Sequence, residues 1–274
     1  MTTENEFQVS HTKLATFRRC KQQYYWKYLK KYFPKPSIGQ SRGSAGHAAL
    51  AVWHKDYNVK TALDAAWTKW YGDGFDDSDE WQLLQKALNN YFAWSYKNDS
   101  FILEESEFKF TLQFETEPVI TLVGYVDGIL SDANRFWLLE NKFQKRASVS
   151  NLDMDAQVTL YLMAMSNLRN DIDGVLYNAV RIGDTKIAVK EPCLRSKIYR
   201  SKNGFNTVAG EIVAQALEMV RFEQEEQAPY RNPTRDCSWD CPFYSVCLSM
   251  LDDGIESEEL LRASCNNSDE EQGE

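Results

Sequence analysis

Hydrophobic and polar residues alternate between Phe101 and Phe114, as they do along a strand that has one buried face. Residues 119–130 and 135–143 are rich in β-branched, aromatic and aliphatic side chains, and turn-forming residues separate them. We expect these three runs to form antiparallel strands at the start of a sheet. Residues 175–182 and 186–189 have a similar character and predict two further strands.

Other stretches carry apolar residues at the spacing of amphipathic helices. This spacing predicts a helix over residues 7–32, a second beginning near Gly43, a third over residues 151–169 and a fourth over residues 207–227. Residues 55–99 predict a helical insertion that packs through a stripe of tryptophan and leucine. Strands followed by a helix and by more strands indicate an α/β domain with a mixed central sheet flanked by helices.

The composition fits one substantial core. The chain has 274 residues, of which 43% are hydrophobic and 13% aromatic. No run of about eighteen apolar residues occurs, and the first residues lack the basic and apolar parts of a signal peptide. We therefore expect a soluble, cytoplasmic protein with no membrane partner and a single domain over residues 1–250.

The net charge of −9 is distributed unevenly along the chain. Residues 7–55 contain no acidic residue but ten basic ones, whereas residues 251–274 contain nine acidic residues and one base, Arg262. A basic segment with interleaved aromatic residues suits a nucleic-acid backbone, although a solvated basic face is the commoner cause of such a pattern. We expect the acidic tail, residues 251–274, to be disordered, with occupation of a basic groove as the alternative.

The predicted hairpin carries charged residues beside apolar ones. Asp127 lies on its first strand, and Glu140 and Lys142, two residues apart on the second, share one face. Such a set could offer two oxygen ligands to Mg²⁺ and a cation at a reacting centre, or it could be a cross-strand salt bridge. Glu104 and Glu105 on the preceding strand are weaker candidates for the same site.

Three of the six cysteines form a C-x₃-C-x₅-C pattern at Cys237, Cys241 and Cys247. Three soft ligands this close together are typical of a metal or an iron–sulfur cluster, and tetrahedral zinc and cubane iron–sulfur sites both take four protein ligands. Zinc ribbons usually have two Cys-x-x-Cys knuckles, and a second knuckle is missing here. The spacing does not select the fourth ligand, for which the candidates are Cys20, Cys193 and Cys265.

Taken together, these residues resemble the PD-(D/E)xK nuclease superfamily. Within it, the chain resembles the RecB-like nucleases that carry an iron–sulfur cluster, such as AddB and the nucleases of CRISPR adaptation. The resemblance covers roughly residues 10–250 and implies a restriction-endonuclease-like core. Five signals in the family's order carry it: Gly43 to His47, Gly124 to Asp127, Glu140-x-Lys142, Gln157-x-x-x-Tyr161, and Cys20 far upstream of the cysteine triplet.

The resemblance also implies roles for individual residues. His47, Asp127 and Glu140 match the ligands of one or two Mg²⁺ or Mn²⁺ ions, with the Asn141 carbonyl as a further oxygen, and Lys142 matches the residue that orients or activates water. Gln157 and Tyr161 match the motif that supports the catalytic centre and contacts the DNA. Cys20, Cys237, Cys241 and Cys247 match the ligands of a [4Fe-4S] cluster that joins the N- and C-terminal segments. Cys193 and Cys265 match nothing in the family.

These roles lead to three hypotheses. The first is a metal-dependent DNA nuclease, an exonuclease acting on DNA ends or single strands in recombination, repair, phage replication or CRISPR adaptation. In that case Arg18, Arg19 and Lys21 join Gln157 and Tyr161 in binding DNA. The second is a non-catalytic nucleic-acid-binding module with a structural cluster, and the third is a structural protein stabilised by zinc.

Overall fold

The structure is a computed structural model that describes residues 6–132, 135–183, 186–252 and 257–267. The chain divides into two compact units. The terminal unit comprises Met1–Lys35, Phe114–Ile120 and Ile212–Glu274, and the sheet unit comprises Pro36–Gln113 and Thr121–Glu211. The residues that we expected to form a single domain are therefore shared between these units.

The sheet unit is built on a mixed sheet, as the sequence predicted. The strand order is β1-β4-β5-β6-β7, and β3 pairs with β4 as well. Strand β4 is antiparallel to β5, β5 is parallel to β6, and β6 is antiparallel to β7. The strands are β1 (Glu6–Val9), β3 (Ile102–Phe114), β4 (Val119–Asp132), β5 (Arg135–Gln144), β6 (Ile172–Arg181) and β7 (Cys193–Ile198). Of these, β1 and the first residues of β4 are counted in the terminal unit.

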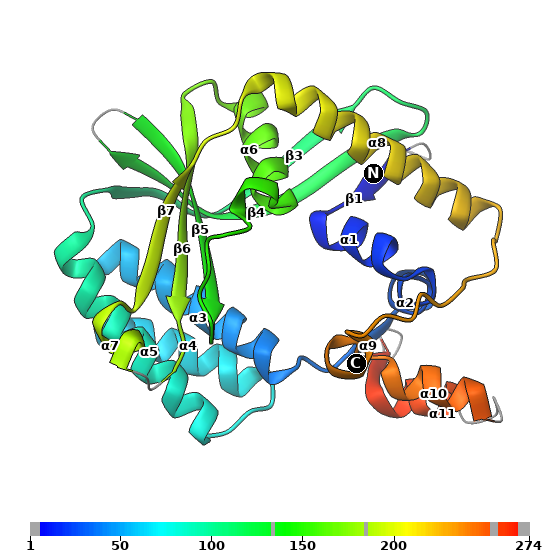
Figure 1. The fold of residues 1–274 in the computed structure, drawn as a ribbon, viewed down its shortest axis with the longest axis horizontal. Coiled ribbons are helices and arrows are strands. Elements are labelled where there is room, and N and C mark those ends of the chain that lie inside the picture. Colours follow the sequence, from blue (N-terminus) through cyan, green and yellow to red (C-terminus); the bar gives the residue numbers. More distant parts are fainter. Residues whose placement is uncertain (1–5, 133–134, 184–185, 253–256, 268–274) are drawn as a thin grey trace, which may run out of the picture. The chain divides into compact units, whose positions relative to one another are not determined.

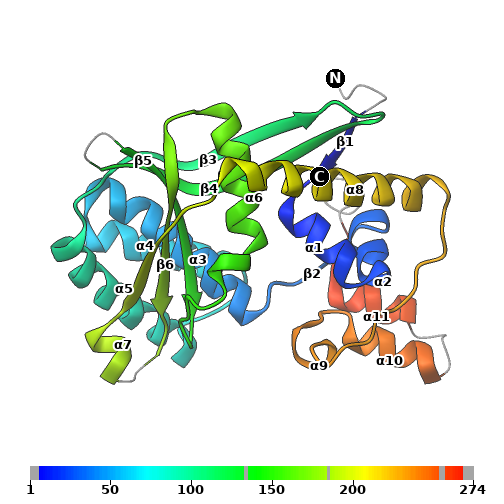
Figure 2. The same ribbon diagram turned by 45° about the horizontal axis from the view of Figure 1, so that its top comes forward.

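Helices cover both faces of this sheet (Figure 1, Figure 2). Helices α3 (Ile38–Asp56), α4 (Val59–Gly72) and α5 (Asp79–Asn98) form a layer on one face, and α6 (Ala156–Leu168) lies on the other. The predicted aromatic stripe of α4 and α5 is buried in this layer, where it packs against α3 and the ends of β6 and β7. The stretch expected to be an insertion thus completes the core of the sheet unit.

The predicted helix over residues 7–32 is interrupted in the terminal unit. Helix α1 (His11–Arg19) ends at Cys20, which has an extended backbone with φ −162°, and α2 (Lys21–Tyr24) continues as a π-helix over Tyr25–Leu29. The expectation of one continuous helix is wrong at this point. The break occurs at a cysteine that the sequence placed among the candidate ligands.

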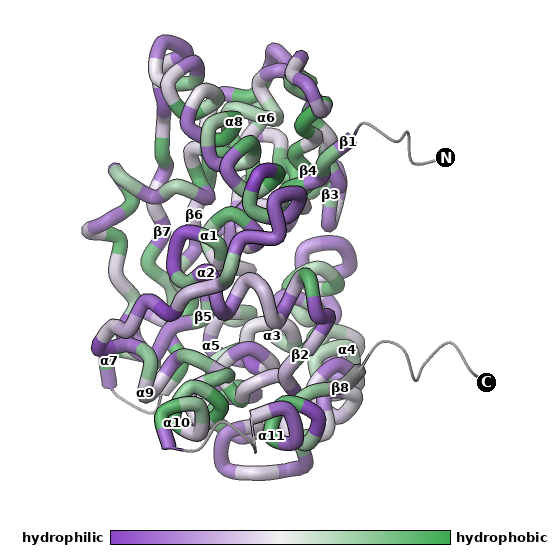
Figure 3. The backbone as a smooth tube through the Cα atoms, turned by 90° about the vertical axis from the view of Figure 1, so that its right-hand side faces the viewer, coloured by the Kyte–Doolittle hydropathy of each residue, from purple (hydrophilic) through white to green (hydrophobic). Residues whose placement is uncertain are grey.

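The rest of the terminal unit comes from the C-terminal part of the chain. It contains α9 (Cys237–Asp240), α10 (Tyr244–Asp252), α11 (Ser257–Ser264) and most of α8 (Lys202–Gln224). Strand β2 (Tyr32–Pro34) pairs antiparallel with β8 (Cys265–Asn267). Hydrophobic residues predominate along α10, which is largely green in Figure 3.

Part of the tail that we expected to be disordered is ordered. Leu261 on α11 and Cys265 on β8 are buried in one cluster with Trp26 and Phe243. The remainder of the tail, residues 253–256 and 268–274, lies outside the described residues. Apolar side chains of the tail therefore compensate, in its middle, for the acidic composition that suggested disorder.

The strand predicted over residues 186–189 is instead a short helix, α7 (Lys186–Lys190). Its place beside β6 is taken by β7, which begins after Pro192. Periodicity cannot separate helix from strand in so short an apolar run, which explains the error. None of the helices in the described ranges has both the length and the apolar character needed to cross a membrane.

Candidate functional site

The site begins where the β4–β5 hairpin opens. The paired residues run from Asp132 and Arg135 to Gly128 and Leu139. At the next residue, the Asp127 side chain replaces the backbone pairing: its Oδ2 accepts a hydrogen bond from the backbone N–H of Asn141 at 2.6 Å. Because the N–H and carbonyl of a strand residue point to the same side, the Asn141 carbonyl is directed toward Asp127 as well. The opening thus presents a carboxylate and a backbone carbonyl together.

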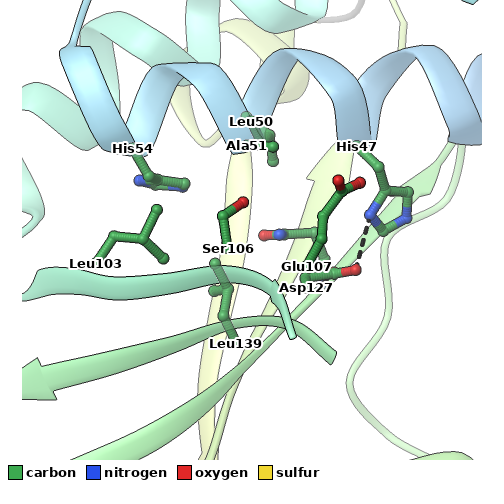
Figure 4. Close-up of a pocket in the computed structure, with 10 residues that line it drawn as sticks. His47, Leu50, Ala51, His54, Leu103, Ser106, Glu107, Asp127 and Leu139 are labelled. Carbon is green, nitrogen blue, oxygen red and sulfur yellow. Dashed lines mark hydrogen bonds and ion pairs between the residues drawn. The ribbon is translucent and has the colours of Figure 1, made fainter. Parts of the chain in front are cut away.

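His47 reaches this point from α3. An added Cβ at the preceding residue, Gly46, would lie 2.4 Å from the Phe143 ring, so only glycine allows α3 to pack this closely on β5. The His47 Nδ1 then lies 3.0 Å from the Asp127 Oδ1, the contact drawn as a dashed line in Figure 4. Burial lowers the pKa of His47, but the charges of Asp127 and Glu140 outweigh that effect and raise it overall.

Glu140, Lys142 and Gln157 form a closed triangle. The Lys142 Nζ lies against the Glu140 Oε1 and also donates to the Gln157 Oε1 at 2.9 Å. Gln157 in turn donates from Nε2 to the Glu140 Oε1 at 3.0 Å. Gln157 stands in the first turn of α6, whose N-cap Asp155 accepts from the Val158 N–H. Alternation along β5 places Glu140 and Lys142 on one face of the strand. The cap fixes where α6 begins, and Gln157 in its first turn meets them there.

Burial makes this triangle electrostatically sensitive. Glu140 is only 4% exposed, and its pKa is raised to about 7 by burial and by the nearby Asp127 carboxylate, against the opposing charges of Lys142 and His47. Two carboxylates held close together away from water favour a bound cation. Their hard oxygens fit Mg²⁺ or Mn²⁺.

One cavity of about 570 Å³ is lined by the side chains of His47, Asp127, Glu140, Lys142 and Gln157. The Asn141 side chain is not part of its wall. The wall of this cavity also contains three residues that sequence reasoning missed as site residues: Lys69, Glu107 and Tyr125. Tyr125 is 57% exposed and lies two residues before Asp127, on the same face of β4. Alternation along β4 could have identified Tyr125. Lys69, on α4, is brought there only by tertiary packing.

Glu107 takes the place that we had considered for Glu104 and Glu105. It lines two cavities beside Asp127, and its side chain extends from β3 toward α3 next to His47 (Figure 4). Its backbone has φ 51°, a conformation that is uncommon for a residue other than glycine. Neither a hydrogen bond nor an ion pair joins its carboxylate to another described residue. A third carboxylate therefore faces the site.

Tyr161 lies behind the site. Its ring packs on Phe110 with centroids 5.3 Å apart, and it does not line the cavity that Gln157 reaches. Burial and the Glu140 charge raise its pKa to about 12. Tyr161 thus packs α6 on the sheet and, unlike Gln157, does not reach the cavity.

The cluster offers oxygen ligands from two carboxylates and one carbonyl, with Lys142 beside them. Within the described residues, no three His, Cys, Asp or Glu side chains converge closely enough to hold a metal ion by themselves. His47 in particular uses its Nδ1 on Asp127. The donors fit a hard divalent ion whose remaining ligands are water or substrate, which is the usual manner of Mg²⁺ binding.

The terminal unit brings four cysteines to a second cavity. Cys20, Cys237, Cys241 and Cys247 line one space of about 150 Å³, together with Arg19 and several apolar side chains. Cys193 and Cys265 are not part of this lining: Cys193 is buried in the core of the sheet unit, and Cys265 is buried in the cluster around Trp26, against which Cys241 and Cys247 pack. The structure thus selects Cys20 among the three candidates for a fourth thiol.

The four thiols influence one another. Burial and the charges of the other three cysteines raise the pKa of Cys247 to about 11. Burial likewise raises the pKa of Cys241, with smaller contributions from Cys237 and Cys20. The pKa of Cys237 is lowered, because the backbone N–H of Thr234 donates to its sulfur. Four soft sulfur donors around one cavity are of the kind that bind zinc or an iron–sulfur cluster.

Two of the three predicted DNA-binding cations are engaged inside the terminal unit. Arg19 pairs with Asp240 at 2.6 Å, and Lys21 pairs with Glu218 at 2.9 Å. Lys21 also lies 3.0 Å from the centre of the Phe17 ring. Arg18, by contrast, is exposed. Only Arg18 among these three is free to meet a phosphate without breaking an internal contact.

Comparisons with known proteins give one family match and two structural neighbours. The sequence profile of the PD-(D/E)XK nuclease superfamily matches residues 8–248. A solved structure of a candidate exonuclease from Eubacterium rectale is similar over 85% of this chain and 86% of that one, with a TM-score of 0.51 at 11% identity. The structure of SSO0001 gives a TM-score of 0.40 at 13% identity, over 90% and 88% of the two chains. The comparison with curated proteins gives no match.

Proposed function

Because the chain belongs to the PD-(D/E)XK nuclease superfamily, we propose that it is an exonuclease that hydrolyses DNA with Mg²⁺ or Mn²⁺ at the Asp127–Glu140 site. The single observation that carries the proposal is the opening of the β4–β5 hairpin. There the Asp127 carboxylate, the Glu140 carboxylate and the Lys142 ammonium surround one cavity of about 570 Å³. A salt bridge alone would not require both carboxylates to be held together with the strands parted.

The residues divide the work as follows. Asp127, Glu140 and the Asn141 carbonyl would hold the ion, which when bound would make a water more acidic and offset the negative charge of the phosphate. Lys142 would orient the attacking water and add positive charge beside the phosphate. Gln157 holds Lys142 and Glu140 in register through its two hydrogen bonds. His47 fixes the Asp127 carboxylate, and ligation of a second ion by His47 is part of the proposal.

We further propose that the substrate is DNA with free ends or single strands, in recombination, repair, phage replication or CRISPR adaptation. The description of the Eubacterium rectale protein as an exonuclease candidate supports this proposal. The exposed Tyr125 in the cavity wall also supports it, because an unpaired base can stack on an aromatic ring. Tyr161, half-buried on α6 and packed on Phe110, would act on the substrate only through Gln157.

We propose that Cys20, Cys237, Cys241 and Cys247 hold a [4Fe-4S] cluster. The common cavity and the mutual influence on thiol pKa support this assignment. The cluster would connect the break between α1 and α2 with the loop around α9, which are more than about 200 residues apart in sequence. A cross-link over so long a loop restricts the unfolded chain strongly.

A nuclease assay tests the catalytic proposal. Labelled single-stranded and double-stranded DNA, with free or blocked ends, is incubated with wild type and with Glu140→Gln in Mg²⁺ or Mn²⁺. Glu140→Gln keeps the shape of the side chain and its bond to Gln157 but removes the charge. We expect it to lose at least about 100-fold of the rate with unchanged folding. Equal rates for the two proteins would refute the site, and equal cleavage of blocked and free ends would refute the exonuclease assignment.

A further inference from the structure

The side chain of Asn141 lies on the face of β5 opposite Glu140 and Lys142, where it lines a small cavity together with His47, Glu107 and Asp127. Glu140 and Lys142 share one face of β5, so the residue between them faces the other. Asn141 is 2% exposed on that face, and a buried amide must find its hydrogen-bond partners within the protein. Asn141 therefore connects Asp127, which its backbone N–H binds, with the groups that its own side chain contacts on this face of the sheet.

A row of polar side chains crosses the sheet behind Asn141. The strand register places Asn141 opposite Asn178, and Asn178 opposite Arg195. Asn178 Nδ2 donates to Asn141 Oδ1 at 3.0 Å, and Arg195 Nε donates to Asn178 Oδ1 at 2.8 Å. The row ends at Asp99, the C-cap of α5, whose Oδ1 accepts from Arg195 Nη1 at 2.6 Å. We call these four residues the polar row.

The surroundings hold the row in one arrangement. Asn178 is completely buried, and its Nδ2 also donates to the Tyr91 hydroxyl at 3.3 Å. The Arg195 guanidinium lies 4.7 Å from the Trp94 ring centre and 5.3 Å from that of Phe101. Since both ends of the Asn178 amide are engaged, rotation of this side chain would break several bonds at once.

The polar row costs free energy of folding that apolar side chains in the same space would not. Within the described residues, Arg195 Nη2 and Asp99 Oδ2 are buried without a hydrogen-bond partner. Burying such groups costs free energy, and well-packed apolar residues are often equally stable or more stable than a buried ion pair. A polar arrangement kept at this cost is expected where orientation matters more than stability.

We propose that Asn178 is a positioning residue of the metal site: held by Arg195, it fixes the Asn141 segment so that the Asn141 backbone meets Asp127. Asn178 touches neither ion nor substrate. It acts through Asn141, whose N–H binds the Asp127 carboxylate and whose carbonyl faces the same opening. The inference rests on the proposed function, because it requires Asp127 and Glu140 to bind the ion.

The test is Asn178→Asp, which keeps the shape and the acceptor for Arg195 but removes the amide that donates to Asn141. Mn²⁺ binding is measured by calorimetry without DNA. We expect the affinity to fall by about 10-fold or more, as for other residues that orient metal ligands. The added negative charge would by itself favour cation binding, so weaker binding must come from altered geometry.

Val175→Ala is the matched control. Val175 is buried on the same strand, β6, but has no polar contact with the row. We expect it to lower the melting temperature while Mn²⁺ affinity stays at the wild-type value. Wild-type affinity in Asn178→Asp would overturn the proposal. So would an equal loss of affinity in Val175→Ala, because the effect would then follow stability alone.

Two further variants keep the outcome decisive. If Glu140→Gln binds Mn²⁺ as tightly as wild type, the proposed metal site fails; if it loses binding and Asn178→Asp does not, only the role of Asn178 fails. Should Asn178→Asp not fold, as judged by circular dichroism, Asp99→Asn replaces it. This change at the far end of the row should weaken Mn²⁺ binding about threefold. An unchanged affinity there would reject the proposal.

Discussion

The two candidate sites differ in how far their own side chains satisfy one another. In the sheet unit, Asp127, Glu140 and Lys142 each have a hydrogen-bonded or ion-pair partner within the protein. In the terminal unit, four thiols surround a largely apolar cavity, where the Cys20 sulfur lies 4.0 Å from the Tyr230 carbonyl and the Cys237 sulfur accepts the Thr234 N–H at 3.3 Å. The first site can form without a metal. We expect the second to depend on the group that the sulfurs are proposed to bind.

Because of this difference, we expect the cysteine site to matter chiefly for stability and the Asp127–Glu140 site chiefly for activity. The sheet unit has a large apolar core of its own, formed by α3, α4 and α5. The cluster of buried residues in the terminal unit around Trp26 and Phe243 is small, and it adjoins the cysteines. We therefore expect loss of the sulfur-bound group to unfold mainly the terminal unit, and changes at Asp127 or Glu140 to alter activity with little effect on folding.

Removal of one sulfur ligand should have the largest effect. In Cys241→Ser, we expect loss of the visible absorption of anaerobically purified protein and destabilisation of the terminal unit by about 5 kcal/mol or more, because binding energy there is folding energy. Thermal unfolding followed by calorimetry should then show a separate, earlier transition. Metal analysis that finds zinc in colourless wild type would instead favour the zinc-stabilised alternative.

Cys265→Ser is the control for this variant. Cys265 is buried in the same apolar cluster but does not line the cysteine cavity. Its replacement buries a hydroxyl and should cost about 1–3 kcal/mol while the colour is kept. A brown Cys241→Ser protein of full stability would disprove the cluster assignment.

A paired glycine experiment should have the next largest effect and bears on the sheet unit alone. A Cβ at Gly46 would lie 2.4 Å from the Phe143 ring, whereas one at Gly43 would meet nothing within 4 Å. Gly46→Ala should cost up to about 3 kcal/mol by overpacking and shift His47 away from Asp127. Gly43→Ala in the same helix should stabilise by about 0.5–1 kcal/mol. Urea unfolding and nuclease rates measure both; similar behaviour of the two variants would contradict the packing argument.

A smaller effect is expected from acid. Burial, together with the Arg195 charge, lowers the pKa of His54 to about 3, so His54 stays neutral in the folded protein. The unfolded chain binds a proton near pH 6.5 and the folded one does not, so stability falls as pH drops through this window. The loss between pH 8 and pH 5 should be about 2 kcal/mol.

His54→Phe removes this titration while keeping an aromatic ring beside Phe101. Urea unfolding of the variant at pH 8 and pH 5 should show a correspondingly smaller pH dependence than wild type. If wild type and variant lose stability in parallel, His54 is not the titrating group. Asp99, whose pKa is raised by burial, would then be examined.

Local pattern was sufficient for the strands that carry the site. The spacing of two residues between Glu140 and Lys142 correctly placed both side chains on one face of β5, and the mixed sheet followed from the order of strands and helices. Gln157 was joined to them through the family resemblance, since helical spacing says nothing about which strand a helix covers.

The features that escaped prediction depend on contacts between distant parts of the chain. Lys69 reaches the cavity because α4 packs on α3, and Glu107 faces it through a strained backbone that no local signal revealed. The break at Cys20 lacks proline and glycine, so helical spacing continued across it. The order of residues 257–265 depends on burial of Leu261 against the terminal unit, which overrides an acidic composition.

The smallest expected effect concerns DNA binding by the terminal unit. Arg18 is exposed, whereas Arg19 and Lys21 are held by Asp240 and Glu218. Arg18→Gln should weaken binding of single-stranded DNA by a few-fold and lower the slope of log affinity against log salt by about 1, the signature of one lost phosphate contact. Lys21 is paired with Glu218 inside the unit, so Lys21→Gln should lower the free energy of unfolding while the salt dependence of DNA binding stays close to that of wild type. Titrations over a range of salt concentrations, with Ca²⁺ in place of Mg²⁺, measure the slope. An unchanged slope in Arg18→Gln would mean that this basic face is only solvated, and that DNA binding depends on the sheet unit.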